Sequence, residues 1–276
     1  SIKINYLKKT SSKPSANLVL FTNENFKIND LKKYLSNSEF SYINDLLKTN
    51  DLKKKLFVFE VSSKKKIVLI SIKNNSKISD VESLGAEFYG RINYGKNSEY
   101  FINSDSIDSK HENFLGHFLH GLKLKSYKFD KYKTKKKTRL ISINIIGNKN
   151  KTSAQNQLKF KALEEGTFYA RDLVSEPGNI LHPDEYAKRL HSLKKDGLKV
   201  NIYDEKKLKK LGMNALLGVG MGSIRGSYLV TMEWNGAKNN SKPLAFVGKG
   251  VCFDTGGYSL KPAKFMEDMT YDMAGS

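Results

Sequence analysis

Short apolar runs that alternate with stretches of helical spacing constrain the fold of this chain most strongly. Runs rich in β-branched or aromatic residues, typical of strands, span 18–22, 56–61, 67–72, 99–103, 139–146, 198–203, 228–234 and 244–253. Apolar residues at helical spacing occupy 81–92, 108–124, 154–174, 183–193 and 205–211. This alternation predicts an α/β fold class, in which helices cover a largely parallel sheet.

A polar, turn-rich stretch at 147–153 divides the chain. Because 276 residues can hold two domains of ordinary size, we expect an N-terminal α/β domain over 1–150 and part of a second domain over 151–276. The sequence lacks an initiator methionine and closes on a glycine-containing loop. We therefore expect a piece of a longer protein.

The composition argues against several classes of protein. No run of about 18 apolar residues is present, so no membrane span is expected. The first residues contain no apolar leader, which argues against a secretion signal. The single cysteine, Cys252, excludes a disulfide within the chain and fits a cytoplasmic protein. Cys252 lies in an apolar run, so we expect a buried, inert thiol rather than a nucleophile.

The formal net charge is +20, which raises the question of a polyanionic partner. Residues 123–139 contain nine basic residues and one acid, Asp130, whereas residues 245–276 contain three lysines and four acids. The excess charge therefore avoids the closing stretch. We favour a lysine-rich, solvated surface, with contact to nucleic acid as the minority alternative.

Three histidines fall in the helical stretch at 108–124, and two of them, His117 and His120, are neighbours on one face. A metal site is conceivable there, but no acid or cysteine nearby in the sequence completes it. A pair of solvated or core-edge histidines is the interpretation we prefer.

The closing stretch concentrates the residues that can carry chemistry. Lys249, Asp254, Lys261 and Asp272 lie among glycines after an apolar run. Aspartate is a hard oxygen ligand for divalent metals, and a lysine can ligate as the neutral amine. The second lysine could stay charged and stabilise an oxyanion. From spacing alone, a structural salt-bridge cluster is the better-supported interpretation, and two carboxylates with one lysine are too few ligands for two metals.

Residues 247–262 (VGKGVCFDTGGYSLKP) resemble the signature of the leucyl aminopeptidase family of dinuclear metallo-aminopeptidases. Residues 126–133, 166–183, 211–223 and 266–276 resemble further parts of that family. The resemblance is detailed from about residue 126 onward, and residues 1–125 match only in general character.

The resemblance implies a role for each site residue. Lys249 would ligate the more loosely held metal, Asp254 would bridge two metals, and Asp272 would bind the same metal as Lys249. Lys261 would be the catalytic lysine that contacts the substrate carbonyl oxygen. Met269 would line the pocket for the first side chain of the substrate.

The resemblance also implies the fold and the reaction. It implies a small, macro-like N-terminal α/β domain and an α/β/α metallopeptidase domain with a mixed, largely parallel sheet, truncated here. The expected activity is release of N-terminal, leucine-like residues from peptides by water activated by two manganese or zinc ions. A bicarbonate base, a cytoplasmic homo-hexamer and further carboxylate ligands are implied for the complete protein, and these residues alone are expected to be inactive.

An alternative from another class is a DNA-binding regulatory protein built on the same fold, since some members of the family act in this way. The basic run at 123–139 motivates this alternative. We favour the solvated-surface interpretation of that run.

Overall fold

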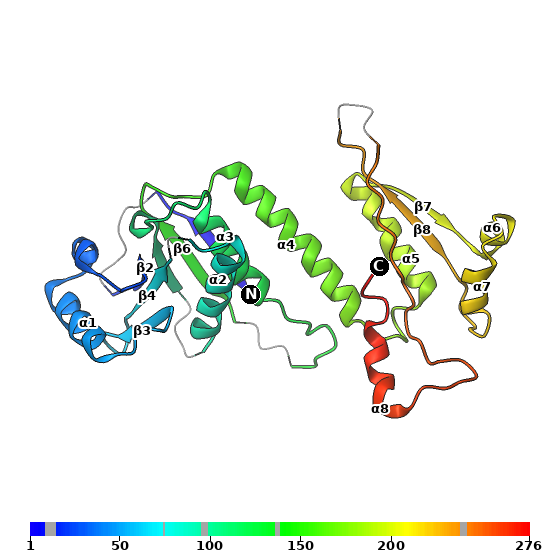
Figure 1. The fold of residues 1–276 in the computed structure, drawn as a ribbon, viewed down its shortest axis with the longest axis horizontal. Helices are drawn as coiled ribbons and strands as arrows, with labels where there is room; N and C mark the ends of the chain where they lie inside the picture. The colour runs from blue at the N-terminus through cyan, green and yellow to red at the C-terminus, as the bar shows by residue number, and fades with distance from the viewer. Residues whose placement is uncertain (9–14, 74, 95–98, 136–138, 238–241) are drawn as a thin grey trace. The chain divides into compact units, whose positions relative to one another are not determined.

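The computed structural model describes residues 1–8, 15–73, 75–94, 99–135, 139–237 and 242–276. The chain forms two compact units, Ser1–Phe168 and Tyr169–Ser276, and each is described here by itself (Figure 1). The division falls inside a helix, whereas the predicted domain boundary at 150 falls in the loop before it. No helix in the described residues is long and apolar enough to cross a membrane.

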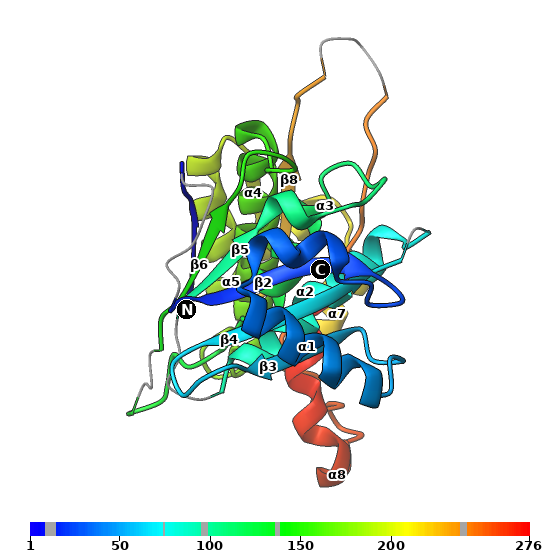
Figure 2. The same ribbon diagram turned by 90° about the vertical axis from the view of Figure 1, so that its left-hand side faces the viewer.

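The first unit is built on a six-stranded sheet with the order β1-β6-β5-β2-β4-β3 (Figure 2). All neighbouring strands are parallel except β3 and β4, which pair antiparallel across a short turn as the sequence indicated. The predicted α/β class with a mostly parallel sheet is therefore confirmed. The strands are β1 (Ile2–Tyr6), β2 (Asn17–Asn23), β3 (Leu56–Glu60), β4 (Lys66–Ile72), β5 (Glu99–Asn103) and β6 (Ile141–Ile146).

Helices pack on both faces of this sheet. Alternate residues of β2 point to opposite faces, as the pleat of a strand requires. Leu18 and Leu20 pack with α1 (Asn37–Thr49), whereas Val19 and Phe21 pack with α2 (Ile78–Ile92) and α3 (Phe114–Lys125). The first unit therefore has two hydrophobic cores, one on each side of the sheet. Short 3-10 helices η1 (Asn29–Tyr34) and η2 (Ser104–Ser106) complete it.

The second unit is smaller and contains one antiparallel strand pair, β7 with β8. The long helix α4 (Ala154–Ser175) begins in the first unit and leads into the second. A single core joins residues of α4 and α5 to the closing stretch of the chain. The remaining elements are α5 (Pro183–His191), η3 (Ser192–Asp196), β7 (Lys199–Tyr203), α6 (Glu205–Lys210), α7 (Asn214–Gly220), β8 (Leu229–Glu233), α8 (Ala263–Met266) and η4 (Glu267–Tyr271).

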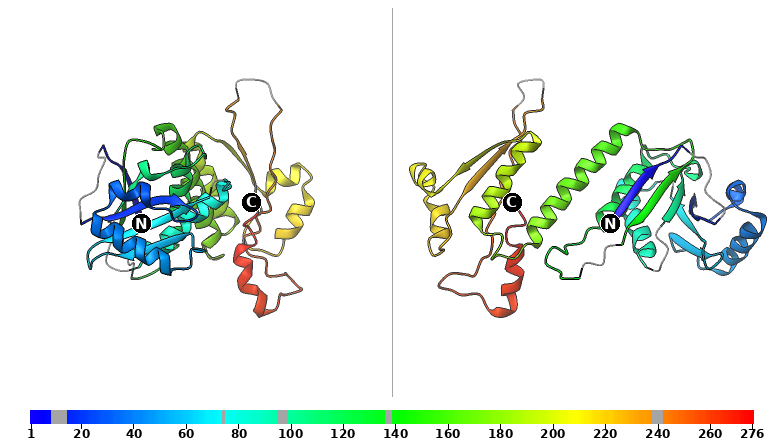
Figure 3. Two further views of the ribbon diagram at one scale, coloured as in Figure 1. Left: turned by 60° about the vertical axis from the view of Figure 1, so that its left-hand side comes forward. Right: turned by 180° about the vertical axis from the view of Figure 1, so that it is seen from behind.

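Several features differ from the sequence predictions, among them helices α1 and α7, which were not among the predicted helical stretches. The edge strand β1 was not predicted, and it pairs parallel with β6 (blue beside green in the right-hand view of Figure 3). Helix α3 begins at Phe114 rather than 108, because Asn113 adopts a left-handed backbone with φ 57°. The strand predicted at 244–253 is wrong. A strand needs a neighbouring backbone to pair with, and no described strand lies beside this segment, where Val247 is fully exposed.

Candidate metal centre

The four charged residues of the closing stretch lie on irregular backbone in the second unit. Lys249 and Asp254 come after β8, in the segment that does not form a strand. Lys261 lies two residues before the short helix α8, next to its N-cap Pro262, and Asp272 follows η4. None of the four side chains therefore stands on a regular strand, and their positions depend on contacts between these segments.

The structure brings the four side chains together in two ion pairs. The Lys249 ammonium lies 2.5 Å from Asp272 Oδ1 and also donates to the Asp272 backbone carbonyl at 2.9 Å. The Lys261 ammonium lies 3.0 Å from Asp254 Oδ2. Each pair joins one residue of the glycine-rich loop to one that lies further along the chain. The arrangement is the salt-bridge cluster that spacing alone favoured.

Electrostatics connect the two pairs. The pKa of the Asp254 carboxyl is lowered, first by the hydrogen bond from the Gly256 amide, then by the hydrogen bond from Lys261. Desolvation opposes these two hydrogen bonds, and the charges of Lys261 and then Lys249 lower the pKa by smaller amounts. Because Lys249 acts on Asp254 although it is paired with Asp272, the two pairs belong to one charged cluster.

A tight turn carries Lys261 back onto Asp254. The Gly256 amide donates to Asp254 Oδ1 at 2.8 Å, and the Lys261 amide donates to the Thr255 carbonyl at 2.9 Å. Gly256 has φ +90°, and a Cβ added there would lie 2.2 Å from the Ser259 carbonyl oxygen. Only glycine fits this position, because a side chain would clash with the backbone and strain the left-handed conformation.

A small hydrophobic core contains residues from the same chain segments as the charged cluster. Cys252 and Met273 are buried in it, with Leu173 and Leu181 from the start of the unit. Burial, with a smaller contribution from the charge of Asp184, raises the pKa of the Cys252 thiol to about 11. A thiol in this state carries almost no thiolate near neutral pH, which agrees with the prediction of a buried, inert cysteine.

One oxygen of the cluster is left without a partner. Asp272 Oδ1 is paired with Lys249, but Asp272 Oδ2 is buried and makes no hydrogen bond. A buried carboxylate oxygen without a partner is costly, and a divalent cation is one group that would satisfy it. Carboxylate oxygens are the donors that hard divalent metals prefer. The carboxylates present therefore fit a divalent cation.

The ligand set is nevertheless incomplete within the described part of the chain. No group of three or more histidine, cysteine, aspartate or glutamate side chains lies close enough there to hold a metal by itself. The cluster offers three donors, the carboxylates of Asp254 and Asp272 and the amine of Lys249. The structure places Met269 on η4, where its carbonyl accepts from the Asp272 amide at 3.2 Å. Met269 therefore shares a turn with Asp272, not with Lys261.

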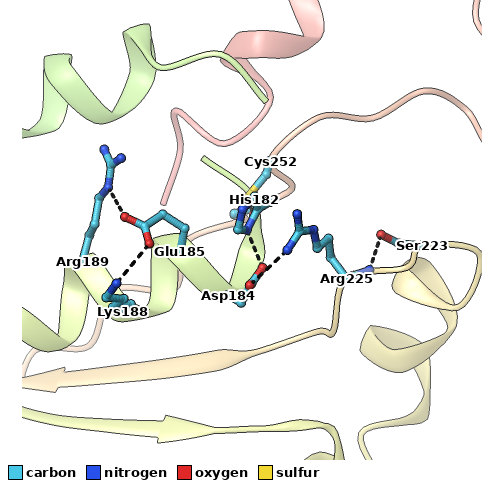
Figure 4. Close-up of polar contacts among 9 residues, drawn as sticks. His182, Asp184, Glu185, Lys188, Arg189, Ser223, Arg225 and Cys252 are labelled. Carbon is cyan, nitrogen blue, oxygen red and sulfur yellow. Dashed lines mark hydrogen bonds and ion pairs between the residues drawn. The ribbon is translucent and has the colours of Figure 1, made fainter. Parts of the chain in front are cut away.

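A polar network on α5, which sequence reasoning missed, lies beside this core (Figure 4). At the start of the helix His182 Nδ1 contacts Asp184, and Arg225 reaches the other oxygen of Asp184 at 3.4 Å. Further along, Arg189 binds Glu185 at 2.9 Å and the deeply buried Glu176 at 2.8 Å. The i,i+4 spacing of Glu185 and Arg189 was the available sequence signal. Glu176 and Arg225 gave no such sequence signal, because they meet their partners only in the folded chain.

The histidines of α3 form two separate pairs rather than a metal site. His117 Nδ1 lies 3.1 Å from Glu82 of α2, and His120 Nδ1 lies 3.2 Å from Glu164 of α4. Nothing in the sequence indicated these partners, because Glu82 and Glu164 both lie far from the histidines along the chain. His120 is buried and His117 is partly exposed, which fits the predicted core-edge pair.

The two described ends of the basic run make contacts within the first unit. Lys123 donates to the Ile2 carbonyl at 2.8 Å, and Arg139 donates to the Asn93 carbonyl at 3.0 Å. Residues 136–138 of the run lie outside the described residues. Lys123 and Arg139 therefore bind partners within the unit, and these two contacts give no support to nucleic-acid binding.

The comparisons with known proteins agree on one family. Residues 168–276, which contain the whole cluster, match the family model described as "Cytosol aminopeptidase family, catalytic domain". The "Probable cytosol aminopeptidase" of Bradyrhizobium sp. (strain BTAi1) is 48% identical over 160 residues, covering 56% of this chain and 32% of the relative. The protein of the same name from Nitrobacter winogradskyi is 41% identical over 205 residues, covering 72% of this chain and 41% of the relative.

Solved structures of this type share the fold. The cytosol aminopeptidase of Coxiella burnetii has a TM-score of 0.71 and 21% identity, covering 98% of this chain and 54% of that chain. The bottromycin maturation enzyme BotP in complex with Mn has a TM-score of 0.70 and 20% identity, covering 95% of this chain and 53% of that chain. The 276 residues thus span about a third to two fifths of these curated relatives and about half of these solved chains.

Proposed function

This chain belongs to the cytosol aminopeptidase family, and on that premise we propose that it carries half of the metal centre of a metal-dependent aminopeptidase. The observation that carries the proposal is the paired cluster, in which Lys249 meets Asp272, Lys261 meets Asp254, and one Asp272 oxygen stays buried without a partner. This cluster lies within the residues matched by the family model.

Lys249, Asp254 and Asp272 would hold the metal, and Asp254 would be shared by two ions. When bound, two divalent ions such as manganese or zinc supply Lewis acidity and lower the pKa of a water molecule. Lys249 can serve as a ligand only as the neutral amine. In the present arrangement its ammonium occupies Asp272 Oδ1, so loading the site requires this ion pair to open and its proton to leave.

Lys261 would act on the substrate rather than on the metal. Its ammonium can stabilise the negative charge that develops on the carbonyl oxygen of the scissile peptide bond. The side chain is partly exposed, at 31%, so a substrate can reach it. The 3.0 Å contact with Asp254 holds the ammonium beside the proposed bridging ligand. Met269 would line the pocket for the first side chain, with a leucine-like preference.

The remaining properties of the complete protein belong to the same proposal. It would release N-terminal residues from peptides, with a bicarbonate ion as a possible proton acceptor, in a cytoplasmic homo-hexamer. Because two carboxylates and one amine are too few ligands for two metals, the 276 residues alone would bind metal weakly and show little activity. The Mn named in the BotP structure supports manganese as the first metal to test.

The test is hydrolysis of leucine p-nitroanilide by the protein expressed from its complete reading frame, with Mn²⁺ or Zn²⁺ added. We expect turnover that chelation abolishes. Lys261→Ala should lower kcat about 100- to 1000-fold. Lys264→Ala should leave it within about twofold, because the Lys264 ammonium lies over the neighbouring Phe265 ring, 5.6 Å from its centre, and outside the two ion pairs described for the cluster. Absence of turnover with either metal, or equal rates for both variants, would reject the proposal.

A further inference from the structure

Tyr186, on the inner face of α5, contacts both chain segments that carry Lys249 and Asp272. Its side chain is buried, with 8% exposure. Its hydroxyl lies 2.8 Å from Ser276 Oγ, and its ring lies 3.6 Å from the position of a Cβ on Gly250. Gly250 directly follows Lys249 in the sequence, and Ser276 belongs to the turn that follows Asp272.

The direction of this hydrogen bond shows what the tyrosine hydroxyl does. Ser276 Oγ donates its only proton to the Met273 carbonyl at 2.7 Å, and the Ser276 amide donates to the same carbonyl at 3.1 Å. The Tyr186 hydroxyl must therefore donate to Ser276 Oγ. It thereby completes a hydrogen-bonded turn over 273–276, immediately after Asp272.

The two segments that Tyr186 contacts also pack on each other. A Cβ on Gly248 would lie 2.5 Å from Ser276 Cα, so the backbone before Lys249 presses against the end of the turn. Tyr186 contacts both sides of this packing, because its ring lies next to Gly250 and its hydroxyl is hydrogen-bonded to Ser276 Oγ. One side chain thus reaches both segments, in addition to the direct contacts of Lys249 with Asp272 and the backbone packing of Gly248 on Ser276.

We propose that Tyr186 is a positioning residue of the metal centre, which holds Lys249 and Asp272 at the separation that a shared cation requires. The inference rests on the function proposed above. It concerns the hydroxyl specifically, because a phenylalanine ring could fill the same space in the core formed with Leu181, Cys252 and Met273. A buried hydroxyl in an apolar core is costly unless it makes a hydrogen bond, and here that bond goes to the turn after Asp272.

The first test is Tyr186→Phe in the protein expressed from its complete reading frame, titrated with Mn²⁺ alone and followed by electron paramagnetic resonance of the free ion. Loss of one hydrogen bond should weaken the looser class of Mn²⁺ site about 3- to 10-fold, and kcat should recover at saturating Mn²⁺. Tyr169→Phe is the matched control, because Tyr169 packs against the same core. It should leave the titration unchanged.

The second test needs no metal. Hydrogen–deuterium exchange of the metal-free protein should become faster in residues 247–252 and 272–276 of Tyr186→Phe, and not in Tyr169→Phe. Ser276→Ala removes the same hydrogen bond, so combining it with Tyr186→Phe should add little further effect.

The outcomes separate this inference from the proposed function. Unchanged exchange and an unchanged Mn²⁺ titration in Tyr186→Phe would overturn the positioning role, whatever the activity of the parent protein. Faster exchange in a parent protein that binds no Mn²⁺ would reject the metal centre itself and leave Tyr186 a purely structural residue. Faster exchange together with a weaker looser site would establish both.

Discussion

At the scale of single residues, the first unit contains a matched contrast between two lysine–glutamate pairs. Glu39 lies 2.5 Å from Lys65, and both side chains are nearly buried, at 12% and 14% exposure. Glu60 lies equally close to Lys66, but its side chain is 69% exposed. Exposed pairs contribute little to stability because solvent screens them. We therefore expect only the Glu39 pair to stabilise the fold measurably.

Glu39→Gln should lower the free energy of unfolding by about 1 kcal/mol at pH 7. Glutamine can still cap α1 in the role that Glu39 shares with Ser36, so the change isolates the ion pair. Desolvation raises the pKa of Glu39, but hydrogen bonds from Lys65 and Ser36 and the charge of Lys65 outweigh it, and the net pKa lies below 4.5.

The sign of this shift fixes the pH dependence of the Glu39→Gln effect. Because the folded pKa is lowered, the contribution of Glu39 is complete above the unfolded value near 4.5 and is lost as the pH falls through the folded pKa. Urea titrations at several pH values should show the two proteins converging in acid. Glu60→Gln should match the parent protein throughout. A difference that persists at low pH would contradict the ion-pair account.

Two adjacent glycines at the metal centre offer a second matched pair. Gly256 and Gly257 both have positive φ, at 90° and 67°, but only at Gly256 would a Cβ meet the backbone, 2.2 Å from the Ser259 oxygen. Gly256→Ala should displace the turn between Asp254 and Lys261 and lower leucine p-nitroanilide hydrolysis more than about tenfold. Gly257→Ala carries the left-handed strain alone and should cost much less. Equal losses would show that the clash does not control the turn.

At the scale of elements, the crossing of α2 and α3 depends on one glycine in each helix. A Cβ on Gly85 would lie 1.8 Å from the Phe118 carbonyl oxygen, and a Cβ on Gly121 would lie 1.9 Å from the Glu82 carbonyl oxygen. Backbone contacts of this closeness leave no flexible side chain that could move aside. The two helices cover one face of the sheet, so their separation sets the packing of that core.

Gly85→Ala should destabilise the first unit by about 3 kcal/mol or more, because overpacking must separate the two helices. Gly90→Ala, in the same helix, meets nothing within 4 Å. It should be neutral or stabilise the protein by up to about 1 kcal/mol, since alanine favours the helix. Chemical denaturation of both variants measures the difference. Similar stability in the two variants would mean that the helices can separate without cost.

The sequence predicted the strands that contain an apolar run and missed the edge strand β1. The runs that became β2 and β4 are apolar along their length, because both faces of the sheet are covered. The edge strand β1 carries Lys3 and Asn5, and its partner β6 lies far away along the chain, although the two strands are neighbours in the sheet. The apolar run at 244–253 looked like a strand, but it has no described neighbour with which to pair.

The same limit applies to the candidate site. The spacing of Lys249, Asp254, Lys261 and Asp272 marked them as residues with chemistry, because charged groups among glycines after an apolar run are unusual. Spacing did not show which lysine pairs with which aspartate. It also gave no sign of Tyr186, whose contacts with Gly250 and Ser276 form only in the folded chain.

At the scale of the whole molecule, the two compact units differ in how completely they bury apolar side chains. The first unit has two extensive cores, whereas the second has one core of five buried residues. In the second unit Phe246, Val247 and Ile224 are almost fully exposed, at 88%, 100% and 98%. Since buried apolar surface is the main source of stability, the first unit should unfold last in the 276-residue chain.

The first part of α4 packs on the first unit, so truncated chains that keep or lack it can test where the first domain ends. Phe160 packs directly on Gly116 of α3, where a Cβ would lie 2.4 Å from the ring, and Glu164 binds His120 at 3.2 Å. The packing is incomplete, because a cavity of about 700 Å³ remains, lined by residues of α3, α4 and β1. The domain proposed at 1–150 lacks these α4 contacts, whereas a chain of 1–168 retains them.

We expect both truncated chains, 1–150 and 1–168, to fold, because the six strands and helices α1 to α3 lie before 150. The longer chain should be more stable by about 2 kcal/mol, the gain from burying the Phe160 ring, reduced by the cavity and increased by the Glu164 contact. Urea denaturation followed by circular dichroism measures the difference. The chain 1–168 with Phe160→Ala should lose most of that difference, whereas Leu158→Ala should not, because Leu158 is 69% exposed. If the chain 1–150 does not fold, the domain boundary lies within α4 and not before it. If the two chains are equally stable, α4 contributes nothing to the stability of the first unit.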